Sequence, residues 1–119
     1  MAAKTLELET LTPLHWLGIV AAAVSAVVHL VLGIDIFPGA FGIAFLVATV
    51  GFLVGIVAVL VAYRRPLIYL LGIPYTAGQI VMWFAFNQPI PPISNIEAVD
   101  KVAQIVLIVV LIVLYRREA

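Results

Sequence analysis

The chain has 119 residues, of which 66% are hydrophobic and only 10% are charged. A soluble domain of this length needs more polar surface to cover its core, so this composition excludes an ordinary soluble protein. Six basic and six acidic residues cancel, which argues against a nucleic-acid partner. The absence of cysteine excludes disulfides, thiol redox chemistry and cysteine-ligated metals. We therefore expect one integral membrane domain.

Four apolar runs are long enough to span a bilayer, because a hydrocarbon core of about 30 Å takes about 20 helical residues. Thr12 is a suitable N-cap for the first run, and Pro13 is a suitable first helical residue. Ser94 or Asn95 can cap the fourth run, after the proline-rich connection NQPIPPISNIEAVDK. We expect helices over about 13–33, 40–63, 66–86 and 96–116. This pattern predicts an all-α fold, an integral membrane four-helix up-and-down bundle.

The basic residues predict the orientation of this bundle. They occupy three sites that share one face of an up-and-down topology, namely Lys4, Arg64 with Arg65, and Arg116 with Arg117. Lysine and arginine mark the cytoplasmic side, so we expect both termini in the cytoplasm and the protein in the cell membrane. Lys101 is the exception, because it lies near the outer end of the fourth helix. We expect it to snorkel or to pair with Glu97.

Small residues form a regular stripe along the second helix. They recur at alternating spacings of four and three residues: Ala44, Ala48, Gly51, Gly55, Ala58 and Ala62. Such stripes let helix backbones approach closely in lipid, where the hydrophobic effect does not drive association. The stripe indicates either packing within one chain or the seam of a homodimer. We expect lipid contacts and either a homo-oligomer or a larger membrane complex.

Polar side chains gather in the outer half of the predicted bundle. The candidates are Ser25 and His29 on the first helix, Thr76, Gln79 and Trp83 on the third, and Gln104 on the fourth. Within the first and third helices, spacings of three and four residues place these side chains on one face. They indicate either simple interhelical hydrogen bonds, worth about 0.6–2 kcal/mol each, or an outward-facing ligand pocket roofed by Asp35 and the proline-rich connection.

His15 and His29 are the only two histidines. Fourteen residues turn a helix through about 1400°, close to four full turns, and rise roughly 21 Å, so both lie on nearly one face. One interpretation makes His15 an interfacial residue beside Trp16 and His29 a hydrogen-bonded core residue. In a second, the spacing resembles the histidine pairs of membrane b-type cytochromes, and a homodimer holds haem between paired histidines. In a third, His29 is a proton-sensitive site.

Three segments together resemble small, uncharacterised four-helix membrane proteins of halophilic archaea. They are TPLHWLGI…AVVHLVLGI (Thr12 to Ile34), YRRPLIYLLGIPYTAGQIVMW (Tyr63 to Trp83) and VDKVAQIVLIVVLIVLYRRE (Val99 to Glu118). The resemblance implies topology and lineage. That family has no assigned activity, so the resemblance implies no functional residue.

The sequence contains no nucleophile–base pair, metal-binding motif or phosphate loop, so we expect no enzymatic activity. The leading hypothesis is a membrane protein that binds a small molecule or lipid in the outward polar pocket, as an accessory subunit or small transporter. A homodimeric b-type cytochrome that ligates haem with His15 and His29 is the alternative from another class. A purely structural membrane partner protein is the third.

Overall fold

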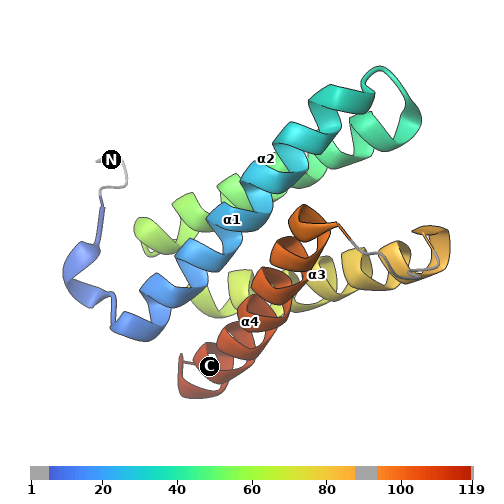
Figure 1. Ribbon diagram of the computed structural model, residues 1–119. Coiled ribbons are helices and arrows are strands. Elements are labelled where there is room, and N and C mark those ends of the chain that lie inside the picture. Colours follow the sequence, from blue (N-terminus) through green and yellow to red (C-terminus); the bar gives the residue numbers. More distant parts are fainter. Residues whose placement is uncertain (1–5, 88–93, 119) are drawn as a thin grey trace.

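A computed structural model describes residues 6–87 and 94–118. A short 3₁₀ turn, η1 (Leu8–Thr10), precedes four helices (Figure 1): α1 (Pro13–Ile36), α2 (Ala40–Leu60), α3 (Arg65–Asn87) and α4 (Asn95–Glu118). The described residues contain no strand, which confirms the all-α prediction. Each of the four helices is long and apolar enough to cross a membrane. Residues 88–93 of the proline-rich connection and Lys4 lie outside the described residues.

Both predicted N-caps are confirmed. The Thr12 hydroxyl accepts a hydrogen bond from the His15 backbone N–H, and the Thr12 backbone N–H donates to His15 Nδ1 at 3.0 Å. This reciprocal capping box uses a histidine where glutamate or glutamine is usual. Ser94 and Glu97 form the second capping box at the start of α4. Two local sequence signals therefore fix where α1 and α4 begin.

Two helix ends differ from the sequence expectation. Gly33 continues α1 because it packs tightly against α2, where a Cβ atom would lie 3.0 Å from the Leu46 side chain. The helix ends three residues later, where Phe37 takes an extended conformation before Pro38. In contrast, α2 ends at Leu60, because Ala62 and Arg64 have positive φ values of 55° and 46° and turn the chain into α3.

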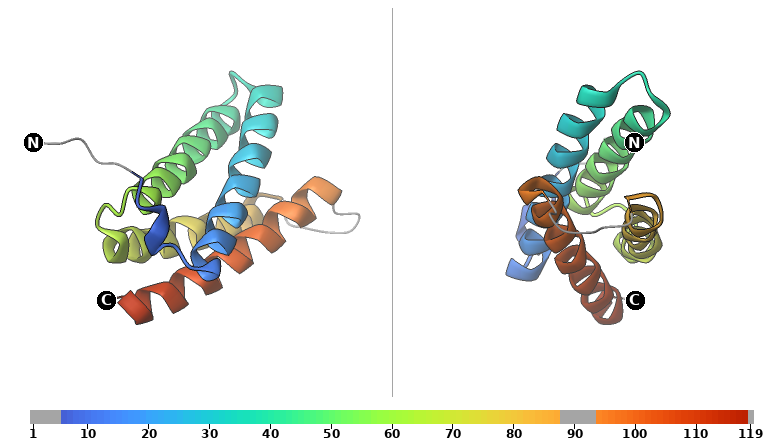
Figure 2. Two further views of the ribbon diagram at one scale, coloured as in Figure 1. Left: turned by 90° about the vertical axis from the view of Figure 1, so that its left-hand side faces the viewer. Right: turned by 45° about the vertical axis from the view of Figure 1, so that its right-hand side comes forward.

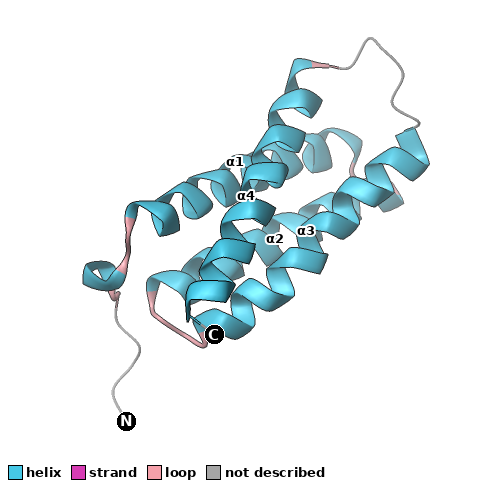
Figure 3. Ribbon diagram, turned by 90° about the horizontal axis from the view of Figure 1, so that it is seen from below, coloured by secondary structure: helices cyan, strands magenta, loops and turns pink. Residues whose placement is uncertain are grey.

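α1 is the central helix of the bundle. It packs along α2 and along α4, and α4 in turn packs along α3, whereas α2 and α3 scarcely touch. Figure 3 shows α4 between α1 and α3. The α1–α2 hairpin and the α3–α4 pair diverge, so that the end of α1 points away from the end of α3 (Figure 2). The up-and-down order is present, but the two hairpins are splayed.

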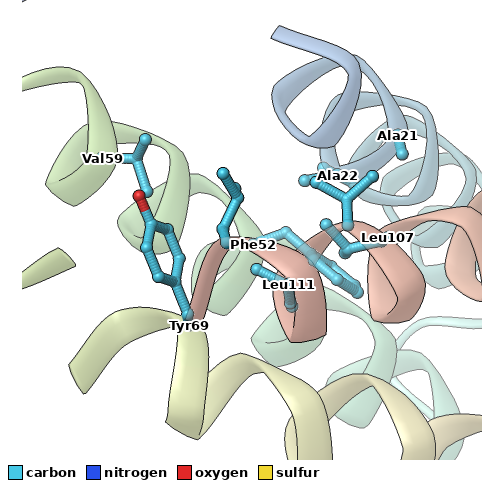
Figure 4. Close-up of a cluster of buried hydrophobic side chains, with 10 residues drawn as sticks. Ala21, Ala22, Phe52, Val59, Tyr69, Leu107 and Leu111 are labelled. Carbon is cyan, nitrogen blue, oxygen red and sulfur yellow. The ribbon is translucent and has the colours of Figure 1, made fainter. Parts of the chain in front are cut away.

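The buried face of α1 consists of small and polar residues, including Gly18, Ala21, Ala22 and Ser25. Larger core side chains approach these positions from the other helices: Phe52 and Val59 from α2, Tyr69 from α3, Leu107 and Leu111 from α4 (Figure 4). A Cβ atom on Gly18 would lie 3.0 Å from Val110, so the glycine allows α1 and α4 to approach closely.

Candidate functional site

A buried polar cluster joins α1 to α4. The Ser25 hydroxyl donates to Asp100 Oδ1 at 2.7 Å and accepts from Gln104 Nε2 at 3.3 Å. His29 Nδ1 donates to the Ser25 carbonyl at 2.8 Å and lies 3.7 Å from Asp100 Oδ1. Ser25 and Gln104 are both 0% exposed. The arrangement is a compact set of donors and acceptors inside the bundle.

Lys101 completes this cluster and links it to α3. Its Nζ atom donates to Asp100 Oδ2 at 2.8 Å and to Gln104 Oε1 at 2.9 Å, and it lies 5.4 Å from the centre of the Trp83 ring. Gln104 Nε2 donates to Gln79 Oε1 at 2.9 Å. The cluster thus spans three helices.

The expected pairing of Lys101 with Glu97 does not form. Glu97 instead accepts from Trp83 Nε1 at 3.2 Å and from the Ser94 backbone and hydroxyl. The reason is local, because Glu97 serves the N-terminal capping box while Lys101 turns toward the buried Asp100 carboxylate.

The structure brings five of the six predicted pocket residues into one connected group. Ser25, His29, Gln79 and Gln104 are in the cluster itself, and Trp83 lies at its edge. Asp100 belongs to the cluster but is not among the six predicted pocket residues. Its signal was an ionisable residue within an apolar helical run, which demands a partner. Asp35 is exposed in the last turn of α1, and no contact joins it to the cluster.

A second polar group lies at the opposite end of the bundle, around His15. His15 Nε2 donates to Glu118 Oε2 at 2.8 Å, and the Tyr69 hydroxyl donates to the same oxygen at 2.9 Å. His15 is 5% exposed, so its ring is buried inside the bundle close to the start of α1. Nearby, Arg65 donates to the Val59 carbonyl and to the Thr10 hydroxyl. These bonds tie η1, the α2–α3 turn and the end of α4 together.

The two histidines differ in how many of their ring nitrogens are engaged. Both ring nitrogens of His15 are engaged, by Thr12 and by Glu118, and His29 uses Nδ1 on the Ser25 carbonyl. Phe45 and Phe52 pack against the His29 ring at centroid distances of 5.4 and 5.7 Å. Haem ligation by His15 requires the loss of a helix cap or of the Glu118 bond. Within the described ranges, no group of three His, Asp or Glu side chains is placed to hold a metal ion.

An apolar cavity of about 270 Å³ has His15 and Tyr69 of the second polar group in its wall. Its wall includes Phe52 and Val59 of α2, Tyr69 of α3, and Leu107 and Leu111 of α4 (Figure 4). Its lining includes no aspartate, glutamate, lysine or arginine, and the ring nitrogens of its histidine, His15, are engaged by Thr12 and Glu118. Of the predicted pocket residues, Thr76 lines this cavity, and Ser25, His29, Gln79, Trp83 and Gln104 do not.

The predicted small-residue stripe on α2 borders this cavity in part. Gly51 and Gly55 both line it. Tyr75 of α3 lies over Gly51 and donates to the Ala48 carbonyl at 2.8 Å, so it is one of the few contacts between α2 and α3. A Cβ atom added to Gly55 would have no neighbouring atom within 4 Å. Farther along, Ala58 is buried, Ala62 is part of the α2–α3 turn and Ala44 is exposed.

No curated protein and no solved structure gives a significant match to this chain. A sequence family does match, over residues 2–115, and its description is "Family of unknown function (DUF7475)". The matched region includes all of α1, α2 and α3 and nearly all of α4, and with them the polar cluster and the cavity. This four-helix chain therefore belongs to the DUF7475 family.

Proposed function

We propose that this chain is an integral membrane protein that spans the cell membrane four times and binds a small apolar molecule or lipid in the cavity between α2 and α3. The halophilic archaeal origin implied by the three sequence segments is part of the same proposal. The protein acts by binding and not by catalysis, as an accessory subunit or a small transporter.

The distribution of side chains supports the membrane part of this proposal. Large aliphatic residues are exposed on each of the four helices, for example Val20, Val47, Val81 and Val102. Polar residues such as Ser25 and Gln104 are fully buried. This arrangement suits a surrounding solvent of hydrocarbon, in which polar groups must find partners inside the bundle.

The arginines support the orientation. Arg64 lies in the α2–α3 turn, and Arg65, the first residue of α3, reaches Thr10 near the start of the described chain. Arg116 and Arg117 are exposed in the last turn of α4, next to Glu118, which contacts His15 near the start of α1. The four described arginines of the predicted basic sites thus lie at one end of the bundle, which favours that end as the cytoplasmic one.

The cavity is the observation that carries the binding proposal. A dry cavity of about 150 Å³ is large enough to bind benzene, and this one measures about 270 Å³. Its rim includes Val54 and Leu71, which are 59% and 56% exposed, so the cavity opens toward the surface between α2 and α3. A molecule dissolved in the bilayer can therefore enter sideways.

Gly55 and Gly78 provide a matched pair of variants to test this proposal. Neither glycine has an atom within 4 Å of its Cβ direction, but only Gly55 lines the cavity. We expect Gly55→Leu to fill the cavity and to reduce labelling of the protein by a photoactivatable long-chain hydrocarbon in lipid nanodiscs. Gly78→Leu should be labelled like the wild type. Mass spectrometry of the cross-linked peptides provides the measurement.

Equal labelling of all three proteins at the α2–α3 wall would contradict binding in the cavity. In that case the polar cluster and the His15 group are interhelical contacts, and the protein is a structural membrane partner.

A further inference from the structure

Thr76 is the one cavity-lining residue whose polar group has no partner in the described part of the chain. Its side chain is 1% exposed and its Oγ1 atom makes no hydrogen bond. The other polar groups of the wall are engaged, because His15 and Tyr69 bind Glu118 and the Tyr75 hydroxyl binds the Ala48 carbonyl. Buried hydroxyl groups in proteins are normally hydrogen-bonded, so this exception requires an explanation.

A bound molecule with a hydrogen-bond acceptor would satisfy this hydroxyl. Thr76 has already lost its water on folding, so a ligand oxygen gains the bond without a further desolvation cost on the protein side. The lining has no lysine, arginine, aspartate or glutamate, and both ring nitrogens of His15 are already bound, so no free group of the wall compensates a charged ligand group. The acceptor that fits is therefore neutral, and a carbonyl oxygen is the simplest such group.

The depth of Thr76 in the proposed bilayer further limits which class of ligand can place an oxygen beside it. It lies eleven residues from either end of α3, which is roughly 16 Å along the helix in both directions. In a hydrocarbon core of about 30 Å, this position is near the midplane. The ester or ether oxygens of a membrane lipid lie near its headgroup, about half that thickness away. Such a lipid can place only its hydrocarbon chain at this depth.

We propose that the cavity is a site for a neutral lipophilic carbonyl compound, such as a long-chain or cyclic ketone, whose oxygen accepts a hydrogen bond from Thr76. This inference rests on the proposed function, because it requires the bundle to be in a bilayer and its cavity to be occupied. The rest of the wall contacts the apolar skeleton of the ligand, and Thr76 selects for the oxygen.

The test uses two probes that differ only at the oxygen. One is a symmetrical long-chain ketone, isotope-labelled at its carbonyl, and the other is the alkane of the same length. Both are titrated into the full-length protein in nanodiscs, as wild type, Thr76→Val and Thr76→Ser. We expect the ketone to bind Thr76→Val about three- to tenfold more weakly than wild type. Thr76→Ser retains the hydroxyl and should bind the ketone nearly as well as wild type, and the alkane should bind all three proteins equally.

The carbonyl infrared band gives a second readout. We expect the carbonyl band of the bound ketone to move to lower frequency in wild type and Thr76→Ser. In Thr76→Val it should stay at the frequency of the ketone dissolved in lipid alone. Equal ketone affinity for wild type and Thr76→Val, or an unshifted band in wild type, would overturn the carbonyl proposal.

Gly55→Leu separates this proposal from the proposed function. If Gly55→Leu weakens both probes while Thr76→Val changes neither, the cavity binds apolar molecules and the carbonyl proposal is wrong. If Gly55→Leu weakens neither probe, the cavity is not the binding site and both proposals fail.

Discussion

Asp100 and Lys101 are neighbours in sequence, yet their side chains meet at 2.8 Å inside a three-helix contact. The Asp100 side chain is 4% exposed, so its charge depends on Lys101 and on the Ser25 hydroxyl for stabilisation. Removing one partner of a buried ion pair leaves an uncompensated charge, whereas removing both does not. The loss of stability on removing either side chain therefore depends on whether the other is still present.

A double-mutant cycle measures that dependence. We expect Asp100→Asn and Lys101→Met each to lower the free energy of unfolding by about 3 kcal/mol. The double variant should be less destabilised than the sum, with a coupling energy of about 1–3 kcal/mol. Unfolding in mixed micelles provides the measurement. The control cycle pairs Glu97→Gln with Lys101→Met, which share only the Trp83 side chain as a partner, and its coupling energy should be smaller than that of the first cycle. Coupling in the control cycle, with additivity in the first, would favour the Glu97–Lys101 pair expected from the sequence.

Substituting valine for each of two buried threonines should change the free energy of unfolding in opposite directions. The Thr49 hydroxyl donates to the Ala26 and Phe45 carbonyls at 3.2 and 3.1 Å, whereas the Thr76 hydroxyl has no partner. We expect Thr49→Val to destabilise the ligand-free protein by about 1 kcal/mol and Thr76→Val to stabilise it by a similar amount. Thermal unfolding of the delipidated protein in one detergent provides the measurement. A destabilised Thr76→Val would mean that the hydroxyl has a partner in the ligand-free protein.

The histidines make a spectroscopic prediction. Since both nitrogens of His15 are hydrogen-bonded, we expect the protein purified from haem-replete cells to show no Soret band in oxidised and dithionite-reduced spectra. A Soret band that disappears in His29→Ala would instead establish the b-type cytochrome hypothesis.

At the scale of the helices, the weak contact between α2 and α3 is the feature that distinguishes this bundle. Tyr75 bridges the two helices by resting on Gly51 and donating to the Ala48 carbonyl. One turn further along α2, no side chain fills the space at Gly55. Of the two glycines in this GxxxG motif, Gly51 therefore contacts α3 and Gly55 lines the cavity.

This difference predicts that adding a methyl group at Gly51 and at Gly55 changes the stability of the protein unequally. Gly51→Ala places a Cβ atom on the Tyr75 hydroxyl and should destabilise the protein by about 1–3 kcal/mol. Gly55→Ala meets no atom and should stabilise it by up to about 1 kcal/mol through helix propensity. Unfolding in mixed micelles compares the two, and equal effects would contradict the contact between Tyr75 and Gly51.

The sequence predicted what depends on local order along one helix. Thr12 and Ser94 identified the helix starts, and helical phase identified the shared faces that bring His29 and Gln104 into one cluster. The continuation of α1 through Gly33 depends on close packing against Leu46 of another helix. The cavity depends on the splay of the two hairpins, which is a property of helix crossings and has no signature in any single helix.

At the scale of the whole molecule, the basic end of the bundle predicts a topology. The chain has no native cysteine, so single cysteines report their own side of the membrane without background. We expect Glu9→Cys and Tyr63→Cys to react with an impermeant maleimide only after the cells are opened, and Asp35→Cys to react in intact cells. The three positions are exposed. Labelling of Tyr63→Cys in intact cells would contradict the orientation.

The central position of α1 has a consequence for biogenesis. α1 leaves the ribosome first, but Asp100 and Gln104, the partners of its Ser25, belong to the last helix to be made. In the proposed membrane topology, α1 enters the bilayer with part of its polar face unsatisfied while α2 and α3 are being synthesised. Asp100 and Lys101 arrive together in α4, so their charges can neutralise each other on entry. The docking of α4 onto α1 is then the step that commits the nascent chain to its folded state. A chain truncated before α4 would leave the polar face of α1 exposed to lipid and to quality control.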